Sequence, residues 1–494
     1  MSGTVDLKTK FCANPFRRAE LLIDGRVTPC CSLWVTHSYG DAYTQSLDDL
    51  WNSKAAQQMR ESILNGSFEY CRKDLCVPIL KGTLPDRDAV TDLELRAIID
   101  GHELRVSDPP RELFLANDES CNLTCPSCRS GLLVASDEKK AHLETVAQDV
   151  IFPTLAAGRP IALSIAGQGD PWASPHYRSI LRYLADHDCN VTQLTLYTNG
   201  VLLTEAVWNN YKGLEKYHPK LGISIDAASS EVYARLRRGD WNKLQTNLAF
   251  LGGLRQRGAL GHFELNMTVQ AENYFEMADM VRLAKANHCD AALFYLIQPT
   301  GDHLRGSYAA KNVAAPKHPE HGALLETLRD PIFADPIVQL YDIDTLRTRA
   351  LTGSGVAGGI AQSRGVALSD EDLIALIDGF LGQGLADGAL EVVAAAQTRL
   401  GQRALLHNLA GAALYMTGAL DRAELHFDRA LALEPNDLQS RLNVGLMKAE
   451  TGQWAAALPI LDGLPLETLD ADTRAQVTQL TARARRQLPL VVAR

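Results

Sequence analysis

Residues 121–128 read Cys-Asn-Leu-Thr-Cys-Pro-Ser-Cys and place three of the ten cysteines of the chain at the spacing C-x3-C-x2-C. A closed zinc site needs four ligands, and no fourth Cys or His follows within this loop. Three thiolates can instead bind three irons of a [4Fe–4S] cluster, because cysteine thiolates are the usual ligands of such clusters. The spacing therefore favours a cluster with one open iron. A three-thiol zinc site or a chance grouping is the alternative.

The residues around this loop alternate between predicted strands and predicted helices. Strands are predicted at residues 112–115, 161–165, 194–198, 221–225, 263–269 and 292–297. Helices are predicted at residues 138–156, 174–187, 203–216, 229–258 and 273–288. This alternation predicts a parallel sheet, and six such units predict a partial (β/α)6 barrel over residues 108–300. Active sites of α/β barrels form at the carboxyl ends of the strands, and the cysteine loop directly follows the first one.

Polar residues and glycines mark the other predicted strand ends. Glycine lets the backbone approach a ligand closely, a carboxylate can accept hydrogen bonds from an amine, and arginine suits a carboxylate. An ordinary glycine-rich turn and a solvated helix-end arginine are the alternatives, and Arg235 and Arg237 compete with Arg238. The candidate ligand-binding residues at these strand ends are Gly167, Gln168, Gly169, Asp170, Thr198, Asn199, Ser224, Asp226 and Arg238.

The cysteine spacing, the Gly-Gln-Gly-Asp segment and the run from Ser224 to Gly239 together resemble the radical S-adenosylmethionine (SAM) superfamily. The resemblance implies that Cys121, Cys125 and Cys128 hold a [4Fe–4S] cluster that reductively cleaves SAM to a 5′-deoxyadenosyl radical, which abstracts a hydrogen atom from the substrate. It also implies that the polar strand-end residues bind SAM and that a flavodoxin or ferredoxin donates electrons. Two positions depart from the family pattern, which has Glu at Asp170 and often an aromatic residue at Ser127.

Residues 1–82 contain five more cysteines, and residues 21–29 read as a β-hairpin with Asp24 and Gly25 at its turn. A helix is predicted at residues 46–64. This segment resembles the auxiliary iron–sulfur domain of radical SAM proteins, in its SPASM or twitch form, although that domain usually follows the barrel. The resemblance implies one auxiliary [4Fe–4S] cluster, and a four-cysteine zinc site is the alternative. The implied ligands are Cys12, Cys30, Cys71 and Cys76, with Cys31 as an alternative to Cys30.

The carboxyl-terminal part reads as a connector and linker at residues 301–368, followed by a helical repeat at residues 369–490. His303, His318 and His321 in the connector lack a convincing metal-ligand arrangement, and residues 352–366 read as a flexible linker. Gly384, Gly418 and Gly452 are 34 residues apart, the period of tetratricopeptide repeats. Such repeats stack into a solenoid, which either docks a protein partner, peptide or carrier or serves as a packing module.

Composition excludes some functions. A net charge of −10 argues against nucleic-acid binding, which usually requires a basic surface. No apolar run is long enough to cross a membrane and no secretory signal is visible, so we expect a cytoplasmic protein.

Three functions compete. The run from Ser224 to Gly239 resembles enzymes that epimerise or dehydrogenate carbohydrates or cyclitols, and this oxidoreductase or epimerase function is favoured; a thiol such as Cys189 or Cys289 would then supply a hydrogen atom. The auxiliary domain and the repeats favour modification of a peptide or protein instead. A non-catalytic scaffold with two structural metal sites is the third possibility.

Overall fold

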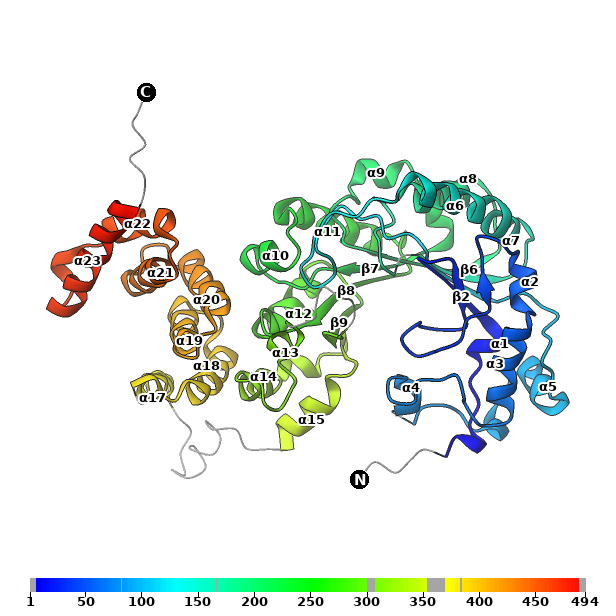
Figure 1. Ribbon diagram of the computed structural model, residues 1–494, viewed down its shortest axis with the longest axis horizontal. Helices are drawn as coiled ribbons and strands as arrows, with labels where there is room; N and C mark the ends of the chain where they lie inside the picture. Colours follow the sequence, from blue (N-terminus) through cyan, green and yellow to red (C-terminus); the bar gives the residue numbers. More distant parts are fainter. Residues whose placement is uncertain are drawn as a thin grey trace.

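A ten-stranded sheet forms the centre of the computed structural model, in the order β10-β9-β8-β7-β6-β5-β4-β1-β2-β3 (Figure 1). The structure describes residues 6–80, 82–165, 167–299, 307–352, 369–382 and 384–487. All six predicted strands are present and neighbouring ones pair in parallel, which confirms the predicted partial barrel. They are β4 (Glu112–Ala116), β5 (Ile161–Ile165), β6 (Val191–Thr198), β7 (Lys220–Ser224), β8 (His262–Val269) and β9 (Ala291–Leu296).

Two further strands extend the parallel sheet beyond the predicted barrel. β1 (Arg18–Leu22) pairs in parallel with β4, with Leu21 opposite Leu115. β10 (Val338–Leu340) pairs in parallel with β9. The cysteine-rich segment and the predicted connector therefore each contribute a strand to the central sheet, and the boundaries predicted at residues 82 and 301 do not separate independent sheets.

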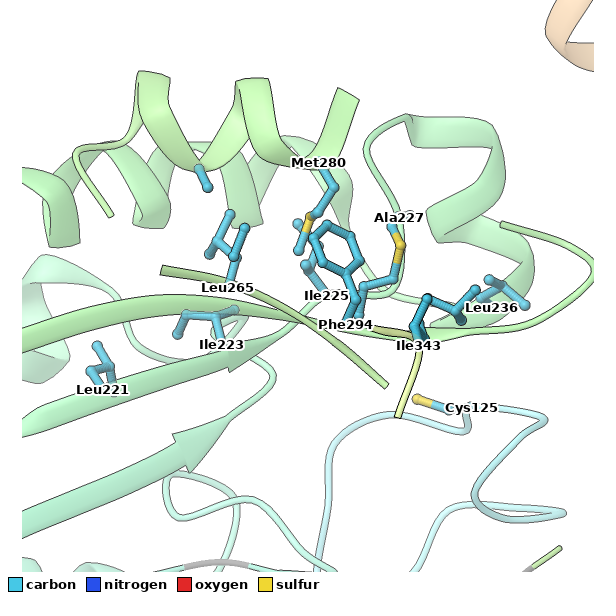
Figure 2. Close-up of a cluster of buried hydrophobic side chains, with 14 of the residues drawn as sticks. Cys125, Leu221, Ile223, Ile225, Ala227, Leu236, Leu265, Met280, Phe294 and Ile343 are labelled. Carbon is cyan, nitrogen blue, oxygen red and sulfur yellow. The ribbon is translucent and has the colours of Figure 1, made fainter. Parts of the chain in front are cut away.

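Helices cover the outer face of the sheet. Alternate residues of β8 (Phe263, Leu265, Met267 and Val269) are apolar and buried, and so lie on one face of the strand. Figure 2 shows Leu265 and Ile223 beneath the helix that carries Met280. The helices are α6 (Asp137–Val146), a π-helical turn (Ala147–Ile151), α7 (Phe152–Ala156), α8 (Pro175–Asp186), α9 (Glu205–Asn209), α10 (Ser230–Leu236), α11 (Trp241–Gln256) and α12 (Met277–Ala286).

The amino-terminal segment forms the predicted hairpin and helices. β1 and β2 (Arg26–Thr28) are antiparallel, and Gly25 has the positive φ of +84° that their turn requires. The buried Arg60 donates hydrogen bonds to the carbonyls of Pro15 (2.9 Å) and Trp51 (2.7 Å). It thereby links the third helix of the chain, on which it lies, to the first two. The remaining elements are α1 (Asn14–Arg17), β3 (Gly40–Asp41), α2 (Leu47–Trp51), α3 (Lys54–Leu64), α4 (Val77–Leu80) and α5 (Leu93–Gly101).

The carboxyl-terminal helices form the predicted solenoid. Gly384, Gly418 and Gly452 share φ angles of +74°, +75° and +78°, so the 34-residue period repeats one turn conformation. The helices are α17 (Asp370–Gly382), α18 (Ala386–Leu400), α19 (Ala404–Met416), α20 (Leu420–Leu433), α21 (Leu438–Glu450), α22 (Trp454–Asp462) and α23 (Ala471–Gln487).

The connector contributes α13 (Tyr308–Lys311), α14 (His321–Thr327) and α15 (Asp344–Thr352). His318 and His321 hydrogen-bond to the carbonyls of Ala310 and Val313. His303 and nearly all of the predicted linker lie outside the described residues. Within the described part of the chain, no helix is both long and apolar enough to cross a membrane.

Candidate functional site

A pocket of about 540 Å³, partly open to solvent, lies at the carboxyl ends of β5, β6 and β7. The loop after β4 contributes three cysteines to it, and the loop after β5 contributes backbone at three successive residues. This is the end of the strands at which α/β barrels hold their ligands. The structure therefore brings together nine of the predicted residues: Cys121, Cys125, Cys128, Gly167, Gln168, Gly169, Thr198, Asn199 and Ser224.

The cysteine loop is held by its own backbone. The amide of Cys128 donates to the carbonyl of Cys125 (2.9 Å), and the amide of Cys121 donates to the carbonyl of Leu133 (3.0 Å). Burial raises the pKa of the Cys121 and Cys125 thiols. Metal ions compete with protons for these sulfurs, so loading the site releases protons.

Arg129 lines the pocket but was not among the predicted residues. Its Nη2 lies 3.3 Å from the sulfur of Cys128 and also donates to the carbonyl of Gln168, while its Nη1 donates to the carbonyl of Glu119 (2.9 Å). The guanidinium therefore joins the cysteine loop to the loop after β5. Its position directly after the third cysteine is the signal in the sequence that could have identified it.

Asp170 does not line the pocket, which corrects its predicted role as a ligand of the SAM amine. Its side chain is buried and accepts hydrogen bonds from the Thr198 hydroxyl (2.7 Å), the Asn199 amide (2.9 Å) and the Trp172 amide (3.0 Å). Burial raises its pKa. Asp170 braces the end of β6 and thereby positions two pocket residues.

Arg237, and not Arg238, lies in the pocket. Arg238 is exposed, has a φ of +53° and does not line the pocket. Arg237 pairs with the buried Asp226 at 2.8 Å, and its Nη1 lies 3.9 Å from the sulfur of Cys125. Asp226 also accepts a hydrogen bond from the Thr268 amide (2.7 Å). The prediction of Arg238 is wrong, and Asp226 acts on the pocket through Arg237.

The electrostatics of Arg237 keep its guanidinium charged. Burial opposes this charge, but the neighbouring Asp226 and Cys125 raise its pKa above the ordinary value. Asp226 thus keeps a permanent cation beside Cys125.

The second group of cysteines lies in the amino-terminal segment. Burial, with contributions from Cys12, Cys71 and Cys76, raises the pKa of Cys30, which places this thiol near the other three. Residues Val35 and Cys71 form an isolated antiparallel bridge that draws the later cysteines toward the hairpin. Glu20 lies near both Cys30 and Cys31, but none of the other thiols is among the groups that shift the pKa of Cys31. Cys30 therefore stays the predicted ligand, with Cys31 as the alternative.

The cysteine sulfurs of the two groups are the kind of ligand that iron–sulfur clusters require. In the described residues, no three His, Cys, Asp or Glu side chains are arranged to hold one metal ion. The fit therefore rests on the donors themselves: one group of three cysteines and one of four, the thiolate ligands that iron–sulfur clusters use.

Cys189 and Cys289 lie away from the pocket. Each precedes a strand, β6 and β9 respectively, and so lies at the amino ends of the parallel strands. Cys289 is buried there, with its amide bonded to the carbonyl of Ala284. Neither thiol is placed to donate a hydrogen atom to a substrate in the pocket, so that hypothesis is wrong.

Comparison with known families supports the amino-terminal assignment. Residues 12–76 match the SPASM family, described as an iron–sulfur cluster-binding domain. This segment is therefore similar to the SPASM family over those residues. The match covers the amino-terminal cysteines and not the cysteine pocket of the barrel.

A curated relative is the AdoMet-dependent heme synthase of Nitratidesulfovibrio vulgaris, 26% identical over 190 residues, which are 37% of this chain and 47% of the relative. The chain thus spans about half the length of this relative. Among solved structures, Streptococcus suis SuiB bound to S-adenosylmethionine is 15% identical with a TM-score of 0.34, over 60% of this chain and 64% of SuiB. The TPR2AB domain of yeast Sti1 is 11% identical with a TM-score of 0.21, over 50% of this chain and 72% of that one.

Proposed function

We propose that the chain is a radical SAM enzyme that uses Cys121, Cys125 and Cys128 to hold the SAM-binding cluster. The observation that carries this proposal is the single pocket that these cysteines share with Gly167–Gly169 and the ends of β6 and β7. When bound, the cluster and SAM supply the radical that removes a hydrogen atom from the substrate. The chain supplies binding, orientation and exclusion of water.

The pocket residues suit the parts of SAM. The glycine backbone after β5 lets a ligand approach closely. The side-chain amide of Asn199 is held in place because its Nδ2 donates a 2.9 Å hydrogen bond to Oδ1 of Asn122. Within the described residues, the buried Nε of Arg237 has no hydrogen-bond partner, so it remains available to a carboxylate. We assign the SAM carboxylate to Arg237.

The auxiliary cluster is proposed on Cys12, Cys30, Cys71 and Cys76 of the SPASM domain. It would exchange an electron with the substrate radical. A flavodoxin or ferredoxin remains the expected external donor.

The substrate we propose is a peptide or protein. The carbohydrate prediction depended on the run from Ser224 to Gly239, but two residues of that run, Glu231 and Arg235, pair with Arg429 and Asp428 of the solenoid. They therefore serve the fold and do not recognise a sugar. The SPASM domain and the repeats, which favour a peptide substrate, are both present.

The first test is anaerobic reconstitution with iron and sulfide, followed by iron counting and a 5′-deoxyadenosine assay with SAM and dithionite. About eight irons are expected per chain, falling to about four when the three loop cysteines become alanine, with SAM cleavage lost. Bound zinc without deoxyadenosine in folded protein would instead support the scaffold hypothesis.

The second test identifies the substrate class. Fractions of a lysate from host cells grown in deuterated medium are added with unlabelled SAM, and deuterium in 5′-deoxyadenosine is measured by mass spectrometry. A peptide substrate predicts transfer that is lost after protease treatment of the fraction. Transfer that survives the protease but not periodate oxidation would restore the carbohydrate reading.

A further inference from the structure

Helix α20 of the solenoid is paired by charge with helix α10 of the barrel. Arg429 of α20 lies 2.9 Å from Glu231, and Asp428 lies 2.7 Å from Arg235. Arg235 also donates to the carbonyl of Asp421 (3.1 Å). Both ends of the short helix α10 are thus tied to the same solenoid helix.

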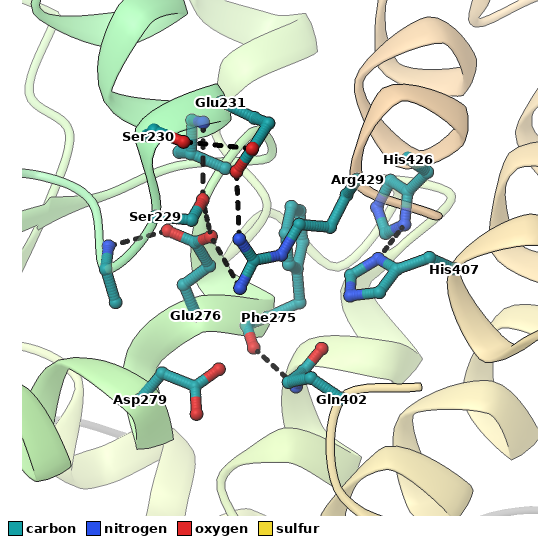
Figure 3. Close-up of polar contacts among 12 residues, drawn as sticks. Ser229, Ser230, Glu231, Phe275, Glu276, Asp279, Gln402, His407, His426 and Arg429 are labelled. Atoms are coloured by element: carbon teal, nitrogen blue, oxygen red, sulfur yellow. Dashed lines mark hydrogen bonds and ion pairs between the residues drawn. The ribbon is translucent and has the colours of Figure 1, made fainter. Parts of the chain in front are cut away.

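Arg429 also neutralises a buried carboxylate of the barrel. Its Nη2 lies 4.0 Å from Glu276, which is 1% exposed. Glu276 in turn accepts hydrogen bonds from the amide of Ala228 (2.7 Å) and the hydroxyl of Ser229. Figure 3 shows Arg429 between Glu231 and Glu276. Because a buried carboxylate is costly without a partner, Arg429 stabilises the loop that follows β7.

Packing of buried side chains also joins the solenoid to the barrel. The ring of Phe275 lies 4.3 Å from that of His426, and Gln402 donates to the carbonyl of Phe275 (3.2 Å) (Figure 3). Most buried side chains of α17–α20 belong to one core with the barrel, whereas α22, α23 and part of α21 form a smaller separate core. The first half of the solenoid is therefore continuous with the barrel.

The carboxyl end of α10 also reaches the cysteine pocket. Arg237 directly follows this helix, and its amide donates to the carbonyl of Tyr233 (2.8 Å). The carbonyl of Arg237 lies 3.6 Å from the sulfur of Cys125, and its guanidinium pairs with Asp226. A helix of seven residues is too short to be stable alone, so its position depends on what packs against it.

We propose that the solenoid is a positioning element of the pocket: Arg429 and Asp428 hold α10 and the loop after β7, and thereby fix Arg237 beside Cys125. The assignment of the pocket to SAM rests on the proposed function. The mechanical link between solenoid and pocket does not.

The test compares Arg429→Met with Lys448→Met in the full chain. Lys448 pairs with Glu424 at 2.6 Å and is 14% exposed, against 15% for Arg429. Glu424 also lies 3.9 Å from Arg235, and Lys448→Met keeps that contact together with those of Arg429 and Asp428, so it is a matched control. Hydrogen–deuterium exchange of the protein as isolated is expected to become about tenfold faster over residues 226–239 in Arg429→Met, equivalent to about 1.4 kcal/mol, and to stay unchanged there in Lys448→Met.

A charge swap supplies the rescue. Arg235→Asp should also accelerate exchange of α10, and adding Asp428→Arg should reverse most of this effect. In reconstituted protein, Arg429→Met should weaken SAM binding severalfold at an unchanged iron content. Should Arg429→Met fail to fold, Glu231→Gln, which leaves Arg429 facing Glu276, takes its place.

Unchanged exchange over residues 226–239, or an equal change in Lys448→Met, would overturn the proposal. A wild-type protein that binds neither iron nor SAM would overturn the proposed function instead, and the exchange comparison would still decide the role of the solenoid.

Discussion

Gly169→Ala is predicted to push the cysteine loop away from the loop after β5. A Cβ at this position would lie 2.4 Å from the carbonyl oxygen of Asp118 and 2.8 Å from that of Ser120. Both are backbone atoms at the base of the cysteine loop and cannot rotate away. Gly169 does not have a positive φ, so the substitution acts through space and not through backbone strain.

The size of the effect follows from these contacts. Ordinary van der Waals contact begins at 3.4 Å, so the loop or the alanine must move by about 1 Å. Overpacking of this kind costs about 1–3 kcal/mol of folding free energy. A displacement of about 1 Å in a catalytic constellation can cost about 100-fold in rate. Catalysis should therefore fall much further than stability.

The assay is reconstitution of wild type, Gly169→Ala and Gly131→Ala side by side. Gly131 lies in the same loop region, and a Cβ there would meet nothing within 4 Å. We expect lower iron retention, weaker SAM binding and a 5′-deoxyadenosine rate about 100-fold lower in Gly169→Ala, with Gly131→Ala like wild type. Wild-type iron and SAM binding in Gly169→Ala would refute the reasoning.

Three further predictions follow from single side chains. Arg129→Met removes the donor 3.3 Å from the Cys128 sulfur, so the reduction potential of the barrel cluster should fall in a redox titration followed by EPR; an unchanged potential would contradict this. Cys30→Ala should lose about four irons while Cys31→Ala keeps them, because the other thiols shift the pKa of Cys30 and not that of Cys31; equal losses would contradict the assignment. Burial raises the pKa of Glu276 from 4.5 to about 7. Between these pH values the folded state holds a proton that the unfolded state has lost, so the free energy of unfolding should fall as pH rises, by ~3 kcal/mol at most. Glu276→Gln should remove this fall. A difference in unfolding midpoint between the two proteins that is constant from pH 5 to 8 would contradict the prediction.

The strands of the barrel could be predicted because their signal is local. Runs such as Ile161–Ile165 are bounded by polar or glycine-rich segments, and their predicted limits match the structure closely. β1 and β10 are different. The hairpin of β1 with β2 is predicted, but the parallel pairing of β1 with β4, about ninety residues further along, is not, and β10 is only three residues long. Pairing between such distant or short segments leaves no pattern in the neighbouring sequence.

The strand-end rule located the pocket but not the direction of every side chain. Thr198, Asn199 and Ser224 line the pocket as the rule implies. Asp170 also follows a strand, yet three hydrogen bonds turn its carboxylate inward. Arg237 and Arg238 are neighbours in sequence, yet Arg237 lines the pocket while Arg238 is exposed and has a positive φ. Such choices depend on tertiary contacts that the sequence does not display.

The arrangement of charge explains why the two predicted carboxylates stand behind the pocket. Three thiolates carry negative charge, and a carboxylate facing them would add repulsion in a poorly solvated site. Asp226 instead holds Arg237 beside Cys125, and Arg129 lies beside Cys128. Both guanidinium groups thus lie next to a thiol, and Asp226 lies beyond Arg237. Removal of Arg237 would leave Asp226 without its charged partner near Cys125. Substitution of Arg237 should therefore destabilise the protein more than substitution of Asp170 or Asp226 would suggest.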